Sequence, residues 1–211
     1  MNEVINVNTT IVNALLLLGG SKFVFTSAGA DDNIATAVAL AVINSSFQVN
    51  VIGGGADAAD ILVVEATRDG WLIPVGNPRT LTNGPSATMT LTAGSIASTG
   101  FNDPQNLLFG QTGFATPTST FIAGVLPCTP IVGFVSTCSD LQQLGGINEA
   151  NPYSLTNKQV VSSPGGDSPA TYLVTDASTK FATPQAPEPT SLLLLGAGLA
   201  ALGFGRRRKN T

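Results

Sequence analysis

Apolar and polar side chains alternate along many short segments of this chain. In residues 88–92, Thr-Met-Thr-Leu-Thr, hydroxyl and apolar side chains take turns, as in a strand with one wet face and one buried face. Turn-forming glycine, proline and asparagine residues separate the segments. The expected strands are residues 22–27, 47–52, 60–67, 71–75, 87–92, 120–125, 131–137, 158–162 and 170–175. Such a series predicts a mainly β, antiparallel, sandwich-like single domain over residues 21–180.

Two segments have the composition of short helices. Asp31, Asp32 and Asn33 precede the alanine-rich residues 34–43 and offer helix-capping side chains. Residues 139–144 run into a glycine pair that would end a second helix. Residues 83–85, Asn-Gly-Pro, are expected to form a turn. One or two short helices are therefore expected beside the strands.

Residues 1–20 fit two descriptions. The apolar run at residues 11–18 contains Asn13 and has no basic residue before it, so it matches a signal peptide poorly. The alternation in residues 4–8 and the run at residues 10–12 favour a strand at least as well. This segment is either a degenerate or truncated signal peptide or the first strand.

The C-terminal segment has three parts in a fixed order. After a proline-rich linker at residues 181–189, which ends in Pro187, Glu188 and Pro189, comes an uncharged run at residues 191–205. As a helix this run would be about 22 Å long, and the basic side chains behind it can bridge the remaining distance across a bilayer core of about 30 Å. We therefore expect residues 190–211 to form a transmembrane helix and a basic tail. The helix would include Ser191, Leu192, Leu195, Gly198, Leu202 and Phe204, and the cytoplasmic stop would be Arg206, Arg207, Arg208 and Lys209.

This order resembles the PEP-CTERM sorting signal of exported bacterial proteins. Ala186 stands where that pattern often has valine, which is a mild departure. The resemblance implies an exported protein that is anchored in the membrane at least transiently, processed by an exosortase-type membrane protease, and then placed on the cell surface or outside the cell. An ordinary C-terminal tail anchor is the alternative.

The charge balance excludes several classes of function. Charged residues make up 10% of the 211 residues, and four of the nine basic residues lie in the tail. Residues 1–205 carry five basic and 13 acidic groups, a net charge of −8, which repels nucleic acid. The sequence contains no histidine, the side chain best suited to acid-base catalysis near neutral pH. No cofactor and no metal site are expected.

A few side chains remain as chemical candidates. Cys128 and Cys138 are expected to form a disulfide in an oxidising compartment. The acidic clusters that could form a catalytic pair or an oxygen cage are Asp31 with Asp32, Asp57 with Asp60, and Asp140 with Glu149. Residues 53–58, Gly-Gly-Gly-Ala-Asp-Ala, resemble a dinucleotide loop but are better explained as a glycine turn, because an apolar strand-like run follows them. The single tryptophan, Trp71, is either a sugar platform or, as we expect, a core residue.

Two classes of function remain. The first is a non-enzymatic exported protein of the cell surface or extracellular matrix, with exopolysaccharide as a candidate partner. The alternative is an exported carbohydrate-binding or carboxylate-dependent hydrolytic domain that uses the same anchor.

Overall fold

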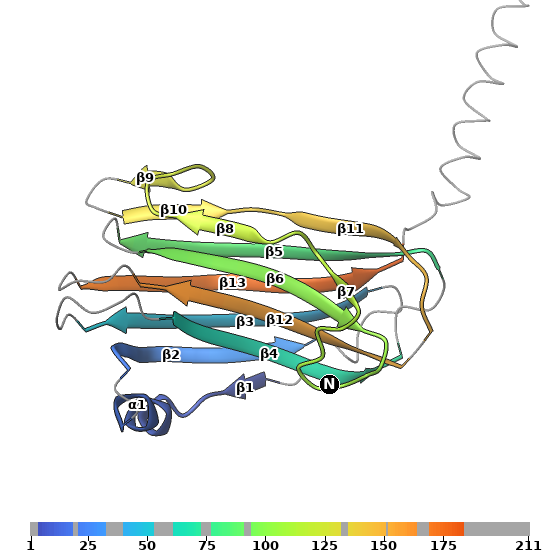
Figure 1. The fold of residues 1–211 in the computed structure, drawn as a ribbon, viewed down its shortest axis with the longest axis horizontal. Helices are drawn as coiled ribbons and strands as arrows, with labels where there is room; N and C mark the ends of the chain where they lie inside the picture. The colour runs from blue at the N-terminus through green and yellow to red at the C-terminus, as the bar shows by residue number, and fades with distance from the viewer. Residues whose placement is uncertain are drawn as a thin grey trace, which may run out of the picture.

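A computed structural model describes most of the chain before the C-terminal segment. The described residues are 4–18, 21–32, 40–52, 61–72, 77–90, 94–131, 135–150, 152–163 and 169–183. Their strands are antiparallel and form two sheets (Figure 1). The prediction of a mainly β fold with antiparallel sheets is therefore confirmed.

The larger sheet has eight strands among the described residues, in the spatial order β1-β2-β3-β13-β5-β10-β9, with β11 also paired to β5. Its strands are β1 (Val4–Asn6), β2 (Phe23–Asp32), β3 (Leu40–Val51), β5 (Arg79–Thr90), β9 (Thr129–Ile131), β10 (Val135–Ser139), β11 (Gln142–Ile147) and β13 (Ala170–Ala182). In β3 and β5, buried and less buried residues alternate along the strand, so one face of each strand is directed into the core.

The smaller sheet has five strands in the described part of the chain. The order is β4-β12-β6-β7, with β8 also paired to β6. Its strands are β4 (Ile61–Trp71), β6 (Ser95–Asp103), β7 (Phe114–Ala115), β8 (Ser119–Ile122) and β12 (Tyr153–Ser162). Within the described residues β4 is an edge strand, paired to β12 alone.

The two sheets pack face to face over two separate apolar clusters. The first cluster contains Phe23, Phe47, Phe121 and Tyr172 among its largest side chains. The second contains Trp71, Tyr153 and Phe181. Trp71 is fully buried, so the prediction that it is a core residue is confirmed.

The described residues contain one helix, α1 (Thr9–Leu18). The Asn8 side chain accepts a hydrogen bond from the Ile11 amide at 3.3 Å, which caps the first turn. The interrupting residue Asn13 bonds both backbone groups of Phe25 at 2.7 Å and attaches the helix to β2. The strand interpretation is thus right for β1 and wrong for residues 10–12.

Both predicted helices are wrong wherever the structure describes their residues. Residues 31 and 32 end β2, and residues 40–43 begin β3, which pairs with β2 and β13. In the other segment, β10 ends at Ser139 and Gln142 begins β11, whose first residues pair with β5. Pairing to central strands of the larger sheet outweighs the local helix propensity.

The Asn83-Gly84-Pro85 turn is also a wrong prediction, because these residues lie inside β5. Pro85 stands where the partner of β5 changes from β11 to β10, and the next two residues of β5 lie opposite a register shift in β13. A proline lacks the amide hydrogen that a continuous ladder requires, so a junction between two partner strands can accommodate it.

The expected disulfide joins Cys128 and Cys138. Both cysteines are buried, and they connect the segment before β9 to β10. The prediction of this pair is confirmed.

Candidate functional site

A cavity of about 460 Å³ opens between the edges of the two sheets, beside β2 and β4. We call it the edge groove. Small residues border it, including Ala28, Ala30, Ser45 and Ala66. In most sandwiches larger side chains fill the space between the sheets. Here the small side chains leave room for a ligand.

An ion pair links the two sheets at the edge groove. Arg68 of β4 donates a hydrogen bond to the carboxylate of Asp32 in β2. The Asp32 side chain is 7% exposed and the Arg68 side chain 27% exposed, so the pair is largely shielded from solvent. The pair offers a hydrogen-bond donor beside an acceptor at a wall of the groove.

The neighbouring carboxylates do not form a catalytic pair. Successive strand residues point to opposite faces, so Asp31 and Asp32 diverge. Asp31 accepts a hydrogen bond from Asn44 at 3.4 Å, whereas Asp32 faces Arg68. Both residues border the groove, together with Glu65 and Asp69 of β4.

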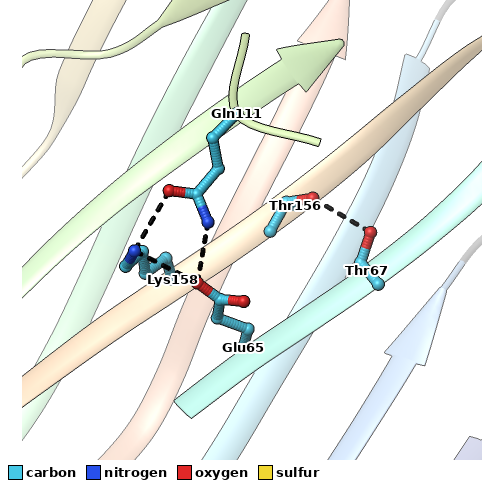
Figure 2. A network of polar contacts seen from close by, with 5 residues as sticks. All are labelled: Glu65, Thr67, Gln111, Thr156 and Lys158. Atoms are coloured by element: carbon cyan, nitrogen blue, oxygen red, sulfur yellow. Dashed lines mark hydrogen bonds and ion pairs between the residues drawn. The ribbon is translucent and has the colours of Figure 1, made fainter. Parts of the chain in front are cut away.

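The connection between β6 and β7 crosses the outer face of the smaller sheet. Gln111 of this connection donates to Glu65 at 2.8 Å and accepts from Lys158 at 3.0 Å, and Lys158 pairs with Glu65 at 3.2 Å (Figure 2). Beside this triangle, the hydroxyls of Thr67 and Thr156 are 2.9 Å apart (Figure 2). These contacts attach residues 104–113 to β4 and β12.

The same connection carries an exposed apolar tip, Leu107-Leu108-Phe109, which we call the rim. Leu108 and Phe109 border the edge groove and are 56% and 54% exposed. The Phe109 amide donates to the Thr67 hydroxyl at 3.2 Å, and the Leu107 carbonyl accepts from Ser154 at 2.7 Å. The rim is therefore held in place although its side chains face solvent.

A closely packed glycine supports the rim. A Cβ added to Gly110 would lie 2.6 Å from Cγ of Asp103, closer than non-bonded carbon atoms can approach. Asp103 also accepts hydrogen bonds from the Gln105 amide at 2.9 Å and the Thr112 hydroxyl at 3.2 Å. The connection is thus built around this buried carboxylate.

A belt of buried polar side chains separates the two apolar clusters. Its centre is Asn157, whose Oδ1 accepts hydrogen bonds from Ser45 at 3.0 Å and from Gln159. Its Nδ2 donates to Asn83 at 3.2 Å and to Thr179 at 2.8 Å. All four hydrogen-bonding positions of the Asn157 amide are used, so the cost of burying it is offset. Ser45 connects the belt to the edge groove.

The third acidic cluster does not assemble either. Asp140 accepts hydrogen bonds from Gln142 at 2.7 Å and from the Leu141 amide at 2.8 Å, and the Gln142 bond is the main reason that its pKa is lowered. Glu149 lies near Arg79 and Asp103, and burial raises its pKa. The two carboxylates thus have different neighbours.

Other candidates lie outside the described residues. These are Asp57, Asp60, the glycine-rich residues 53–58 and the whole C-terminal segment from residue 184. In the part of the chain that the structure describes, no group of three histidine, cysteine or acidic side chains is placed to hold a metal ion. Within the same ranges, no helix is long and apolar enough to span a bilayer.

Comparison with protein families gives a match at the C-terminal end of the chain. Residues 185–209 match the family model of the PEP-CTERM protein-sorting motif. The chain carries a PEP-CTERM sorting motif. The match includes Pro187, Glu188 and Pro189, the apolar run and the basic residues 206–209. No curated protein sequence matches the chain.

A PEP-CTERM motif implies an exported protein that is anchored in the membrane by its C-terminal segment before an exosortase processes it. The described domain would then be the exported part. Sequence reasoning had singled out the PEP-CTERM residues and Asp32 but not Arg68 or Phe109. The only sequence signal for Phe109 is the apolar triplet in an otherwise polar connection.

Proposed function

We propose that this chain is a non-enzymatic protein of the cell surface or extracellular matrix, delivered through its PEP-CTERM motif and processed by an exosortase. The observation that carries the proposal is the family match over residues 185–209, at the C-terminal end of a β-rich domain. Exopolysaccharide is the matrix component that we propose as a partner.

The charge pattern supports a membrane stage before release. Residues 191–205 contain no charged side chain, and four basic side chains follow at 206–209. Such cations hold a helix end on the cytoplasmic side and leave the preceding domain outside. Glu188 follows Ala182, the end of β13, by six positions. An extended chain of this length reaches about 20 Å, enough to place the Pro-Glu-Pro group beyond the sandwich and within reach of a membrane protease.

The side chains around the edge groove support a binding role over catalysis. Asp31 and Asp32 diverge, and Asp32 is engaged by Arg68. A hydrolase that uses two carboxylates needs both of them to face one bond of the substrate. The sequence contains no histidine to activate a serine or threonine nucleophile.

Deletion of residues 187–211, followed by cell fractionation, tests the delivery route. The proposal expects the shortened chain to lose surface location and C-terminal processing. A variant with alanine at Pro187, Glu188 and Pro189 should keep the apolar run but lose processing. Pro184→Ala, in the linker outside the matched residues, is the control and should behave as the unchanged chain. Unchanged location and processing of the deletion variant would rule the proposal out.

The alternative is a carbohydrate-binding or carboxylate-dependent hydrolytic domain delivered by the same motif. The edge groove favours its binding form, because it joins apolar and polar groups in one cavity. A panel of glycoside substrates separates the two forms. Turnover that disappears in Asp31→Asn or Asp32→Asn would identify a hydrolase and contradict the non-enzymatic assignment.

A further inference from the structure

The rim keeps apolar side chains at the surface in a strained conformation. The φ angles of Asn106 and Phe109 are 55° and 58°, in the left-handed region that side chains other than glycine seldom adopt. Asparagine adopts this region readily, but a phenylalanine there costs about 1–3 kcal/mol, and the cost persists only where surrounding contacts enforce it. Strain of this kind concentrates at binding sites, so the rim is a candidate ligand contact.

Specific hydrogen bonds enforce that conformation. The Asn106 side chain accepts from the Gly70 amide at 2.6 Å, where β4 ends. Thr67 and Ser154 hold the backbone of Phe109 and Leu107. The rim side chains are thus pre-positioned beside the groove, which lowers the ordering cost of binding.

The polar groups of the groove favour a neutral, hydroxyl-rich ligand. The Asp32–Arg68 pair places an acceptor beside a donor without net charge. Adjacent hydroxyl groups of a sugar can donate to the first and accept from the second. Asp69 and Asp31 add negative charge along the border, which repels anionic polymers, whereas the charge of Glu65 is balanced by Lys158.

The apolar side chains at the edge groove also suit a sugar ligand. Sugar rings have one polar edge and C–H groups on their faces, so they suit a site in which an aromatic or aliphatic side chain lies opposite fixed hydrogen-bonding groups. Phe109 and Leu108 are the apolar side chains of this site, and the small residues that line the groove leave space for a sugar ring. The volume of about 460 Å³ is within the usual range of about 300–1,000 Å³ for small-ligand sites.

We propose that the edge groove binds a neutral saccharide chain, with Phe109 and Leu108 against a sugar face and the Asp32–Arg68 pair bonded to its hydroxyls. The inference rests on the proposed surface or matrix role and gives that role a ligand class. Binding by the purified protein is independent of sorting, so failure of one proposal is distinguishable from failure of the other.

Titration calorimetry of the full chain in detergent tests the site with defined probes. These are neutral hexasaccharides of glucose, mannose and N-acetylglucosamine, with an oligogalacturonate as the anionic probe. At least one neutral probe should bind, and the oligogalacturonate should bind at least tenfold more weakly. No binding to any neutral probe, or equal binding of the anionic one, would overturn the proposal.

Phe109→Gly isolates the rim without endangering the fold, because glycine adopts positive φ without strain. It should weaken binding at least tenfold while the midpoint of denaturant unfolding stays equal or rises. Leu126→Ala removes another exposed apolar side chain, in the β8–β9 turn, and should change neither quantity. Unchanged binding in Phe109→Gly would contradict the assignment. The assignment would also be contradicted if an extended peptide displaced the sugar by pairing with the edge of β4 that has no partner strand among the described residues, since that would identify a peptide site.

Discussion

Replacing Asn157 by leucine should destabilise the domain strongly, although the two side chains are similar in size. The amide uses all four of its hydrogen-bonding positions at the centre of the sandwich. Leucine would leave Nε2 of Gln159 without its bonding partner, at a cost of about 1–3 kcal/mol. Hydrogen bonds to Asn83, Thr179 and Ser45 would also be lost, at about 1 kcal/mol each.

Some of that loss is recovered. The added apolar surface contributes about 1–2 kcal/mol when buried. The Ser45 hydroxyl can turn toward Gln159, which lies 3.1 Å away. The expected net decrease in the free energy of unfolding is about 3 kcal/mol. Equilibrium urea unfolding, followed by fluorescence of the buried Trp71, measures it.

A matched control and a double variant make this prediction specific. Gln143→Ala removes an exposed amide on β11 and should change stability by less than about 0.5 kcal/mol. When Asn157 and Asn83 are both replaced by leucine, the loss should be smaller than the sum of the single losses by about 1 kcal/mol, because the two amides bond each other. A loss below about 1 kcal/mol for Asn157→Leu, or strict additivity, would refute the reasoning that the belt is a coupled network.

Three further predictions concern the rest of the domain. Gly110→Ala should lower the free energy of unfolding by about 2 kcal/mol, because the new methyl group overlaps buried atoms. The control is Gly145→Ala, because the atom nearest to the new methyl group would be 3.7 Å away. This control should leave the free energy of unfolding in the same urea titration nearly unchanged. Burial raises the pKa of Glu149, so its protonated form stabilises the fold below about pH 4.5 and this contribution is lost as the pH rises through the folded-state pKa. Glu149→Gln should therefore gain stability relative to the unchanged chain between pH 4 and pH 7, and parallel pH profiles would contradict the assignment. Replacing Cys128 and Cys138 by serine should lower the free energy of unfolding by about 2–3 kcal/mol, because the disulfide closes a loop with a sequence separation of 10. An equal unfolding midpoint with and without the disulfide would contradict this prediction.

Alternation along the chain predicted parts of β2, β3, β4, β5, β8, β10, β12 and β13 and therefore the mainly β architecture. The alternation did not predict β6, because this strand faces the belt of buried polar side chains. The core-facing residues of β6 include Ser98, Gly100 and Asn102, of which Ser98 accepts a hydrogen bond from Asn83 at 3.1 Å. A strand that faces buried polar side chains has no apolar period, so a hydrophobic pattern cannot reveal it.

The helix predictions failed because they used only local information. Residues 40–43 have neighbours on both sides in the larger sheet, and residues 142–144 pair with β5. Residues 9–18 show the reverse case, in which a side-chain cap and leucine-rich composition form a helix where a strand was equally favoured.

The edge groove could be predicted only in fragments. Asp32 stood out as one of a pair of acidic residues, but its partner Arg68 comes from the other sheet. The space itself arises from small residues on three strands, and the rim from a distant connection. Such convergence depends on the packing of the sheets and has no local signature. The PEP-CTERM motif, by contrast, is contiguous and could be identified from its residues alone.

The most direct test of the account is the intact mass of the protein recovered from the surface or medium of the exporting cell. The account predicts a C-terminus close to the Pro-Glu-Pro group, with the apolar run and residues 206–209 removed. The full C-terminal segment should remain in cells that lack exosortase activity. A mature surface protein that retains every residue through Thr211 in exosortase-containing cells would contradict the central claim that this segment is a processed sorting signal.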